Sequence, residues 1–223
     1  MTTTASPSQT QSRCRSSPMV AMLAMLLASG CGSTVQERVA ELNRAGVAHL
    51  LQHNYPAAEA EFRQALALAP DDPQVHYNLA VVAHAQGRLA DAEPHYRRAL
   101  TLQPHSLPAR RGLALLFWQQ NRQEELRQFI TEWLNDRHDS ADALALYGWY
   151  LLRQGDYPAA ETVLDRALAI EPHHPFALAE RGRLYELYHY PDRARSLYER
   201  SLQYDPWQPE LLARLTQLRR NSP

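Results

Sequence analysis

The sequence predicts an all-α solenoid built from five helical hairpins and a C-terminal capping helix. Three observations predict this fold class. Small and bulky apolar residues recur at a fixed interval, a leucine returns in all five copies, and a proline returns in four of them. Within a copy, apolar residues fall at helical spacing on both sides of a turn. Because one such hairpin cannot bury its apolar face alone, the copies are expected to stack.

The repeat is clearest between Gly155 and Pro172. Shifting this stretch by multiples of the interval places small residues on small ones and bulky residues on bulky ones, except in the third copy, where Leu126 and Trp133 stand at small positions. The leucine column, which defines the interval, holds Leu66, Leu100, Leu134, Leu168 and Leu202. The proline column holds Pro70, Pro104, Pro172 and Pro206, with His138 in the third copy.

The first half of a copy supplies the other helix of the hairpin, since Leu144, Tyr147, Gly148 and Leu151 fall on one helix face. With the small, bulky and proline columns that follow, this pattern resembles the tetratricopeptide repeat family, whose signature is W-x2-L-G-x2-Y, then A-x3-F, then P over about 34 residues. The resemblance runs from Val39 to Pro206. It implies a right-handed superhelix that binds other proteins in a concave groove.

The chain begins with a segment typical of a secretory signal. A polar stretch carrying Arg13 and Arg15 precedes the apolar run at residues 19–28, which is shorter than the roughly 20 residues that span a bilayer. Cys31 directly after LASG resembles a bacterial lipoprotein signal, which implies that Cys31 becomes the acylated first residue. An uncleaved anchor and a soluble protein with an unusual leader remain the alternatives.

The cysteine count agrees with export. Cys14 leaves with the signal and Cys31 carries lipid, so the mature chain keeps no free thiol in an oxidising compartment. The residue after Cys31 is Gly32 and not Asp, which by the lipoprotein resemblance implies the outer membrane, on its periplasmic side. The mature net charge is 21 − 24 = −3, so no basic excess indicates nucleic-acid binding.

The expected domains follow from the repeat interval. Residues 1–30 are the signal, 31–38 a short linker from the lipidated cysteine, and 209–223 a capping helix and tail. The five repeats are expected at residues 39–72, 73–106, 107–140, 141–174 and 175–208. The third repeat departs from its siblings at Leu126, Trp133 and His138, through either a local widening or a bend that shapes a partner site. Pro94 is expected in the first turn of its helix.

No catalytic motif occurs, and we therefore expect no enzyme, no cofactor and no small-molecule substrate. The sequence lacks HExxH, GxSxG, CxxC and GxGxxG, and without any lysine it has no phosphate-binding loop. His49 and His53, four residues apart on one expected helix face, are the one metal hypothesis, and no third ligand accompanies them. Surface positions are expected for the junction histidines His105, His138, His173 and His174.

The family resemblance implies that the first helix of each hairpin lines the groove. Carried onto this chain, the groove residues are Asn43, Tyr77, His84, Arg111, Trp118, Trp149 and Arg183. Aromatic and arginine side chains are common interface anchors, while the alternative for each is a place in the core. The family's carboxylate clamp is absent, because Asn78 matches one of its positions but Val47, Pro108 and Gly112 occupy three others.

These observations predict a lipid-anchored, non-enzymatic scaffold that binds protein partners during assembly of a cell-envelope complex. The design resembles the repeat lipoproteins of type IV pilus assembly, the pilotins. An adaptor for peptidoglycan enzymes is the alternative, followed by a cytoplasmic chaperone adaptor and a metal-dependent enzyme. Fold alone does not decide among them.

Overall fold

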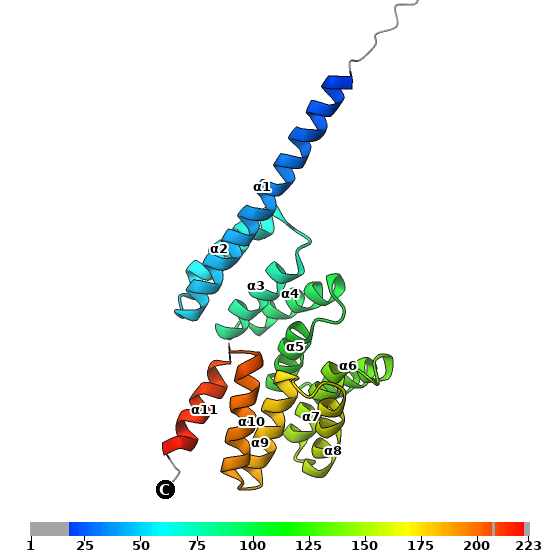
Figure 1. Cartoon of the computed structure of the whole chain (residues 1–223), viewed down its shortest axis with the longest axis vertical. Helices are drawn as coiled ribbons and strands as arrows, with labels where there is room; N and C mark the ends of the chain where they lie inside the picture. Colours follow the sequence, from blue (N-terminus) through cyan, green and yellow to red (C-terminus); the bar gives the residue numbers. More distant parts are fainter. Residues whose placement is uncertain (1–17, 207, 221–223) are drawn as a thin grey trace, which may run out of the picture. The chain divides into compact units, whose positions relative to one another are not determined.

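The computed structural model describes residues 18–206 and 208–220, with side chains from Val35 onward. These residues form eleven helices and no strand, which confirms the all-α class (Figure 1). The chain divides into two compact units, residues 1–75 (unit 1) and residues 76–223 (unit 2), and each is treated by itself. Residues 1–17 of the expected signal and residues 221–223 of the expected tail lie outside the described residues.

Unit 1 is a hairpin of α1 (Pro18–Leu51) and α2 (Tyr55–Leu68). The backbone of α1 is helical through residues 31–38, where the sequence predicts a short linker. Gly30 and Gly32 weaken a helix there but do not end it, since no proline follows before Pro56. Within the described part of the chain, we find no helix with the length and apolar character needed to cross a membrane.

The two helices of a hairpin approach closely because a small residue faces a bulky one. A Cβ added to Gly46 on α1 would lie 2.5 Å from the ring of Phe62 on α2, and Phe62 is fully buried. Distances of this kind are shorter than any van der Waals contact, so only glycine fits there. In unit 1 a small residue of one helix therefore packs directly against a bulky residue of the other.

Unit 2 contains most of α3 (Pro73–Ala85), from residue 76 onward, and eight further helices. These are α4 (Leu89–Leu102), α5 (Leu107–Gln119), α6 (Gln123–Asp136), α7 (Ala141–Gln154), α8 (Tyr157–Ile170), α9 (Pro175–Leu187), α10 (Pro191–Tyr204) and α11 (Pro209–Arg220). From α4 onward, neighbours in sequence pack on one another (Figure 1). In addition, α7 packs against α5 and α9, so the first helices of successive hairpins lie side by side.

The same small-to-bulky contact recurs in unit 2. An added Cβ at Gly148 would lie 2.6 Å from Leu164, and one at Gly182 would lie 2.6 Å from the ring of Tyr198. Each contact joins the two helices of one hairpin, α7 to α8 and α9 to α10. The fixed interval of the sequence therefore marks a repeated interhelical contact as well as a repeated pattern of residues.

The expected surface position is wrong for one of the four junction histidines. His105, His138 and His173 are exposed as predicted, but His174 is only 4% exposed. His174 is the N-cap of α9: its Nδ1 accepts a hydrogen bond from the Ala177 N–H at 3.1 Å, and its Nε2 donates to Asp142 Oδ1 at 2.8 Å. The first backbone N–H groups of a helix need such a partner, and this need draws the imidazole inward.

Two features of the chain's middle also differ from simple repeats. Pro94 lies inside α4, five residues after Leu89, so the expectation that it falls in the first turn is wrong. The helix continues because the proline ring is exposed and only one backbone hydrogen bond is lost. In the third repeat Leu126 and Trp133 are buried, and the Arg110 guanidinium lies 4.4 Å from the Trp133 ring centroid.

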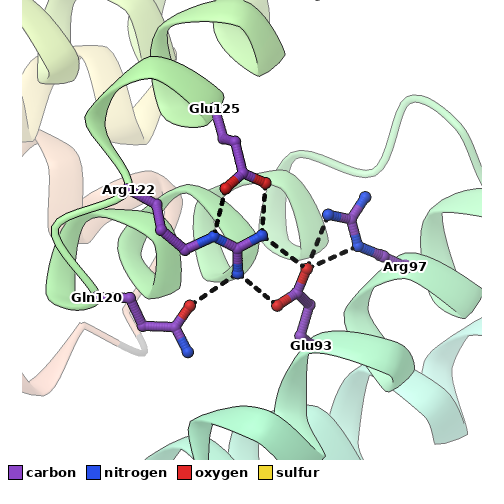
Figure 2. A network of polar contacts seen from close by, with 5 residues as sticks. All are labelled: Glu93, Arg97, Gln120, Arg122 and Glu125. Carbon is purple, nitrogen blue, oxygen red and sulfur yellow. Dashed lines mark hydrogen bonds and ion pairs between the residues drawn. The ribbon is translucent and has the colours of Figure 1, made fainter.

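A network around Arg122 joins three helices, as Figure 2 shows. Arg122 is the N-cap residue of α6, and its Nε donates to Glu125 Oε1 at 2.7 Å. Its Nη1 donates to Glu93 Oε2 on α4 at 2.6 Å and to Gln120 Oε1, just after α5, at 2.8 Å. The guanidinium also lies 4.5 Å from the centroid of the buried Phe117 ring.

This network fixes the ends of α5 and α6 against α4. Hydrogen bonding to Glu125 and Glu93 raises the pKa of Arg122, so the guanidinium stays charged. In turn, the hydrogen bond from Arg122 lowers the pKa of Glu93, with Arg97 acting in the same direction. Because α5 packs on α7, the network also positions the side chains that α5 carries.

We expect Ala167→Trp to destabilise the protein by about 1 to 3 kcal/mol, because it forces a large ring into a close contact on α8. Ala167 is fully buried, whereas Ala169 on the same helix is exposed. Ala169→Trp is therefore the matched control and should change stability little. Denaturant unfolding of both variants measures the difference, and equal effects would contradict the assigned register.

We expect Arg122→Ala to lower the free energy of unfolding by about 1 to 2 kcal/mol at pH 7. The pKa of Glu93 lies below its ordinary 4.5 in the folded protein, so its stabilising effect is complete above pH 4.5 and is lost as the pH falls through the lowered value. The variant should therefore lose less stability on acidification. Arg127→Ala, which removes an exposed pair with Glu124 on the same helix, should change stability far less. Urea titrations at several pH values would disprove this if the two variants behaved alike.

Candidate functional site

Three arginines lie on the first helices of successive hairpins in unit 2. They are Arg111 on α5, Arg153 on α7 and Arg183 on α9. Since these helices pack side by side, we call the surface that carries the three guanidinium groups the arginine face. Arg111 and Arg153 are exposed, and Arg183 is half-buried.

Buried aromatic rings lie beneath two of these guanidinium groups. The Cζ atom of Arg111 is 3.8 Å from the ring centroid of Phe176, and that of Arg153 is 5.5 Å from the centroid of Trp149. Phe176 and Trp149 are 4% and 6% exposed. A cation over an aromatic ring is held by the electron density of the ring face. Such a contact leaves the N–H donors of the guanidinium edge free to bind a further group.

The arginine face encloses one carboxylate, Glu180 on α9. Glu180 is 4% exposed, and its Oε2 lies 3.7 Å from Arg183 Nη1 without a hydrogen bond from any described residue. Burial raises the pKa of Glu180, and the charges of Arg183, Arg111, Arg153 and Arg214 oppose that rise. Four guanidinium groups thus act on a single buried acid.

The donors of the arginine face are not used within the described chain. Arg111 and Arg153 make no hydrogen bond or ion pair there, and Arg183 has only the long contact to Glu180. Arg181, by contrast, donates to Asp165 at 2.8 Å and to Glu161 at 2.7 Å. Desolvation lowers the pKa of both Arg111 and Arg153, so protein surrounds these groups even though their side chains are exposed.

The structure brings Tyr77 and Arg111 together among the predicted groove residues. Burial raises the pKa of Tyr77, and the charge of Arg111 acts against that rise. Trp118 lies seven residues after Arg111, two turns along the same face of α5, and is half-buried. Both rings also pack on the core of unit 2.

Three other predicted groove residues are not among the guanidinium groups of the arginine face. Trp149 is buried beneath Arg153, so the structure favours the alternative that its ring belongs to the core. His84 is half-buried, with Nε2 2.8 Å from Gln119 Oε1 and Nδ1 3.3 Å from the Tyr96 hydroxyl. Asn43 is half-buried on α1 and belongs to unit 1.

Sequence reasoning missed Arg153 and Glu180. Arg153 occupies the thirteenth position of its expected repeat, which is one of the groove positions of the family, so the pattern contained the signal. Glu180 gave no signal, because a glutamate next to Arg181 on a helix is typical of a solvated surface. Its burial follows from the packing of α9 against α7.

The metal hypothesis based on His49 and His53 is wrong in its geometry. His53 lies beyond the last residue of α1, Leu51, with a φ of 58°, so the two imidazoles do not share a helix face. The Nδ1 atom of His53 instead lies 3.1 Å from the hydroxyl of Tyr55. Among the residues that the structure describes, no cluster of three or more His, Cys, Asp or Glu side chains is placed to hold a metal ion.

Comparisons with known proteins agree with the repeat architecture. Three family models described as tetratricopeptide repeat match the chain at residues 43–106, 83–150 and 141–184. Cellulose synthase operon protein C of Xanthomonas axonopodis pv. citri is 31% identical over 162 residues, which are 67% of this chain and 10% of that protein. The chain therefore spans about a tenth of the length of this relative.

Solved structures are similar in fold. TTC0263, a tetratricopeptide repeat protein of Thermus thermophilus, has a TM-score of 0.61 at 22% identity, covering 81% of this chain and 98% of its own. PilW, described as a widely conserved type IV pilus biogenesis factor, has a TM-score of 0.52 at 20% identity, covering 82% and 87%. At these identities the likeness concerns the fold.

Proposed function

Because this chain belongs to the tetratricopeptide repeat family, which binds protein partners, we propose that it is a non-enzymatic scaffold whose arginine face holds a partner. One observation carries this proposal: three guanidinium groups on adjacent helices have donors that the described chain does not use. Arginines and aromatic rings of this kind are the residues that contribute most at interface centres.

The proposed location is the periplasmic side of the outer membrane, with a lipid on Cys31 as the anchor. Its support is the sequence LASG before Cys31, the glycine at position 32, and the absence of any cysteine after residue 31. Several acyl chains on one cysteine, as the lipoprotein resemblance implies, hold a protein firmly, whereas one chain binds only weakly.

The proposed process is assembly of a cell-envelope complex, with type IV pilus biogenesis as the first candidate. The fold similarity to PilW, a type IV pilus biogenesis factor by its description, supports that candidate. The second candidate is a cellulose synthase complex, which the 31% identity to an operon protein of that name favours. An adaptor for peptidoglycan enzymes stays an alternative, which rests only on analogy of architecture.

Changing the acylated residue tests the anchor. We expect the wild-type protein to sediment with outer membranes and Cys31→Ser to remain soluble, because the short apolar run cannot replace acyl chains. Cys14→Ser is the matched control and should sediment like the wild type. Fractionation with mass spectrometry of the N-terminus decides the matter: a wild-type protein that is soluble and retains Met1 excludes the lipoprotein.

Site-specific crosslinking in cells tests the partner surface. A photoreactive amino acid at Tyr77 or Trp118, both near Arg111, should give an adduct with a partner, whereas one at the exposed Arg166 on α8 should not. Mass spectrometry of the adduct then separates a pilus assembly protein from a cellulose synthase component. Adducts from Arg166 alone would move the interface to the second helices. Circular dichroism of each variant checks that the fold is intact.

A further inference from the structure

We propose that the arginine face binds the carboxylate of an acidic side chain, Asp or Glu, within a peptide segment of the partner, and that Arg111, Arg153 and Arg183 hold it. This inference rests on the proposed function and adds the chemical class of the bound segment. The segment is internal to the partner, so the bound group is a side chain and not a chain terminus.

The guanidinium groups of the arginine face have the hydrogen-bonding capacity to bind a carboxylate. A guanidinium has five N–H donors and binds a carboxylate through two of them at once. In unit 2, Arg181 meets two carboxylates and Arg122 meets two, so the chain supplies acids wherever it uses arginine to fix helices. At Arg111 and Arg153 no described acid forms an ion pair, although both side chains are exposed.

The positive charges around the arginine face favour a further carboxylate. Desolvation is the largest cause that lowers the pKa of Arg153, and the positive charges of Arg183 and Arg214 lower it further. Arg214 is paired with Glu186 at 2.6 Å, which leaves Glu180 as the acid set among the three arginines of the face. A second carboxylate placed there would relieve the repulsion among like charges.

Two further acids act on the face from a distance. The charges of Asp205 and Glu210 raise the pKa of Arg111, against the larger lowering by desolvation. They reduce the net positive charge of the face. The face therefore selects a carboxylate by hydrogen-bond geometry more than by long-range attraction.

The apolar side chains beside Arg111 indicate which residues flank the acidic residue in the partner's peptide segment. Tyr77 lies near Arg111, and Leu115 and Trp118 follow Arg111 at positions four and seven residues along α5. All three are half-buried and pack on the core, so they offer apolar surface next to the charged site. An acidic residue flanked by apolar residues matches this surface.

Peptide binding to the purified full-length protein in detergent tests the inference. Three fluorescent peptide pools with random apolar flanks are compared by anisotropy: central Glu with blocked ends, central Gln with blocked ends, and central Gln with a free C-terminus. We expect the first pool to bind at least tenfold more tightly than the other two. Raising the NaCl concentration should weaken this preference by screening.

Point variants assign the binding to the face. Arg111→Gln and Arg153→Gln should each reduce the preference for the Glu pool at least fivefold, while Arg166→Gln on α8 should leave it unchanged. Both face residues are exposed, so the fold is expected to tolerate the changes, and thermal unfolding checks this. Equal binding of the Glu and blocked Gln pools, or binding of the free C-terminus alone, would overturn the inference.

The outcome separates this inference from the proposed function. If crosslinks form at Tyr77 and Trp118 while the Glu pool shows no preference, a partner binds the face without an acidic side chain, and only the inference is wrong. If crosslinks form only at Arg166, the proposed surface is wrong, and the inference is wrong with it.

Discussion

The structure depends on the close approach of the two helices within a hairpin, where a glycine faces a bulky side chain. Gly46 against Phe62, Gly148 against Leu164 and Gly182 against Tyr198 leave no room for a Cβ atom. In unit 2 the first helices α5, α7 and α9 also pack side by side, and the side chains of three hairpins reach one surface.

That packing gives several side chains two roles. Trp149 and Phe176 are core residues, yet their rings also support the guanidinium groups of Arg153 and Arg111. A ring buried in this way is rigid, so the cation above it loses little freedom when a partner binds. The arginine face can therefore be preorganised although the described chain gives two of its arginines no acidic partner.

Periodicity predicted the features that all copies share: the all-α class, the paired small and bulky columns, and the spacing of the helices. It could not predict features that belong to one copy. The helix through residues 31–38, the proline inside α4 and the inward His174 each depend on a local contact or on the lack of a strong helix stop. Glu180 belongs to the same class, because its burial arises from contacts between helices of different repeats.

The chain uses arginine for two distinct purposes, and the available acids distinguish them. Arg122 and Arg181 each meet two carboxylates from the same chain, so they hold helices together. Burying donors without acceptors is costly, and a structural arginine must therefore be paired. Arg111 and Arg153 avoid that cost by staying in contact with solvent above an aromatic ring. A carboxylate of a partner can bind such donors without breaking an ion pair within the described chain.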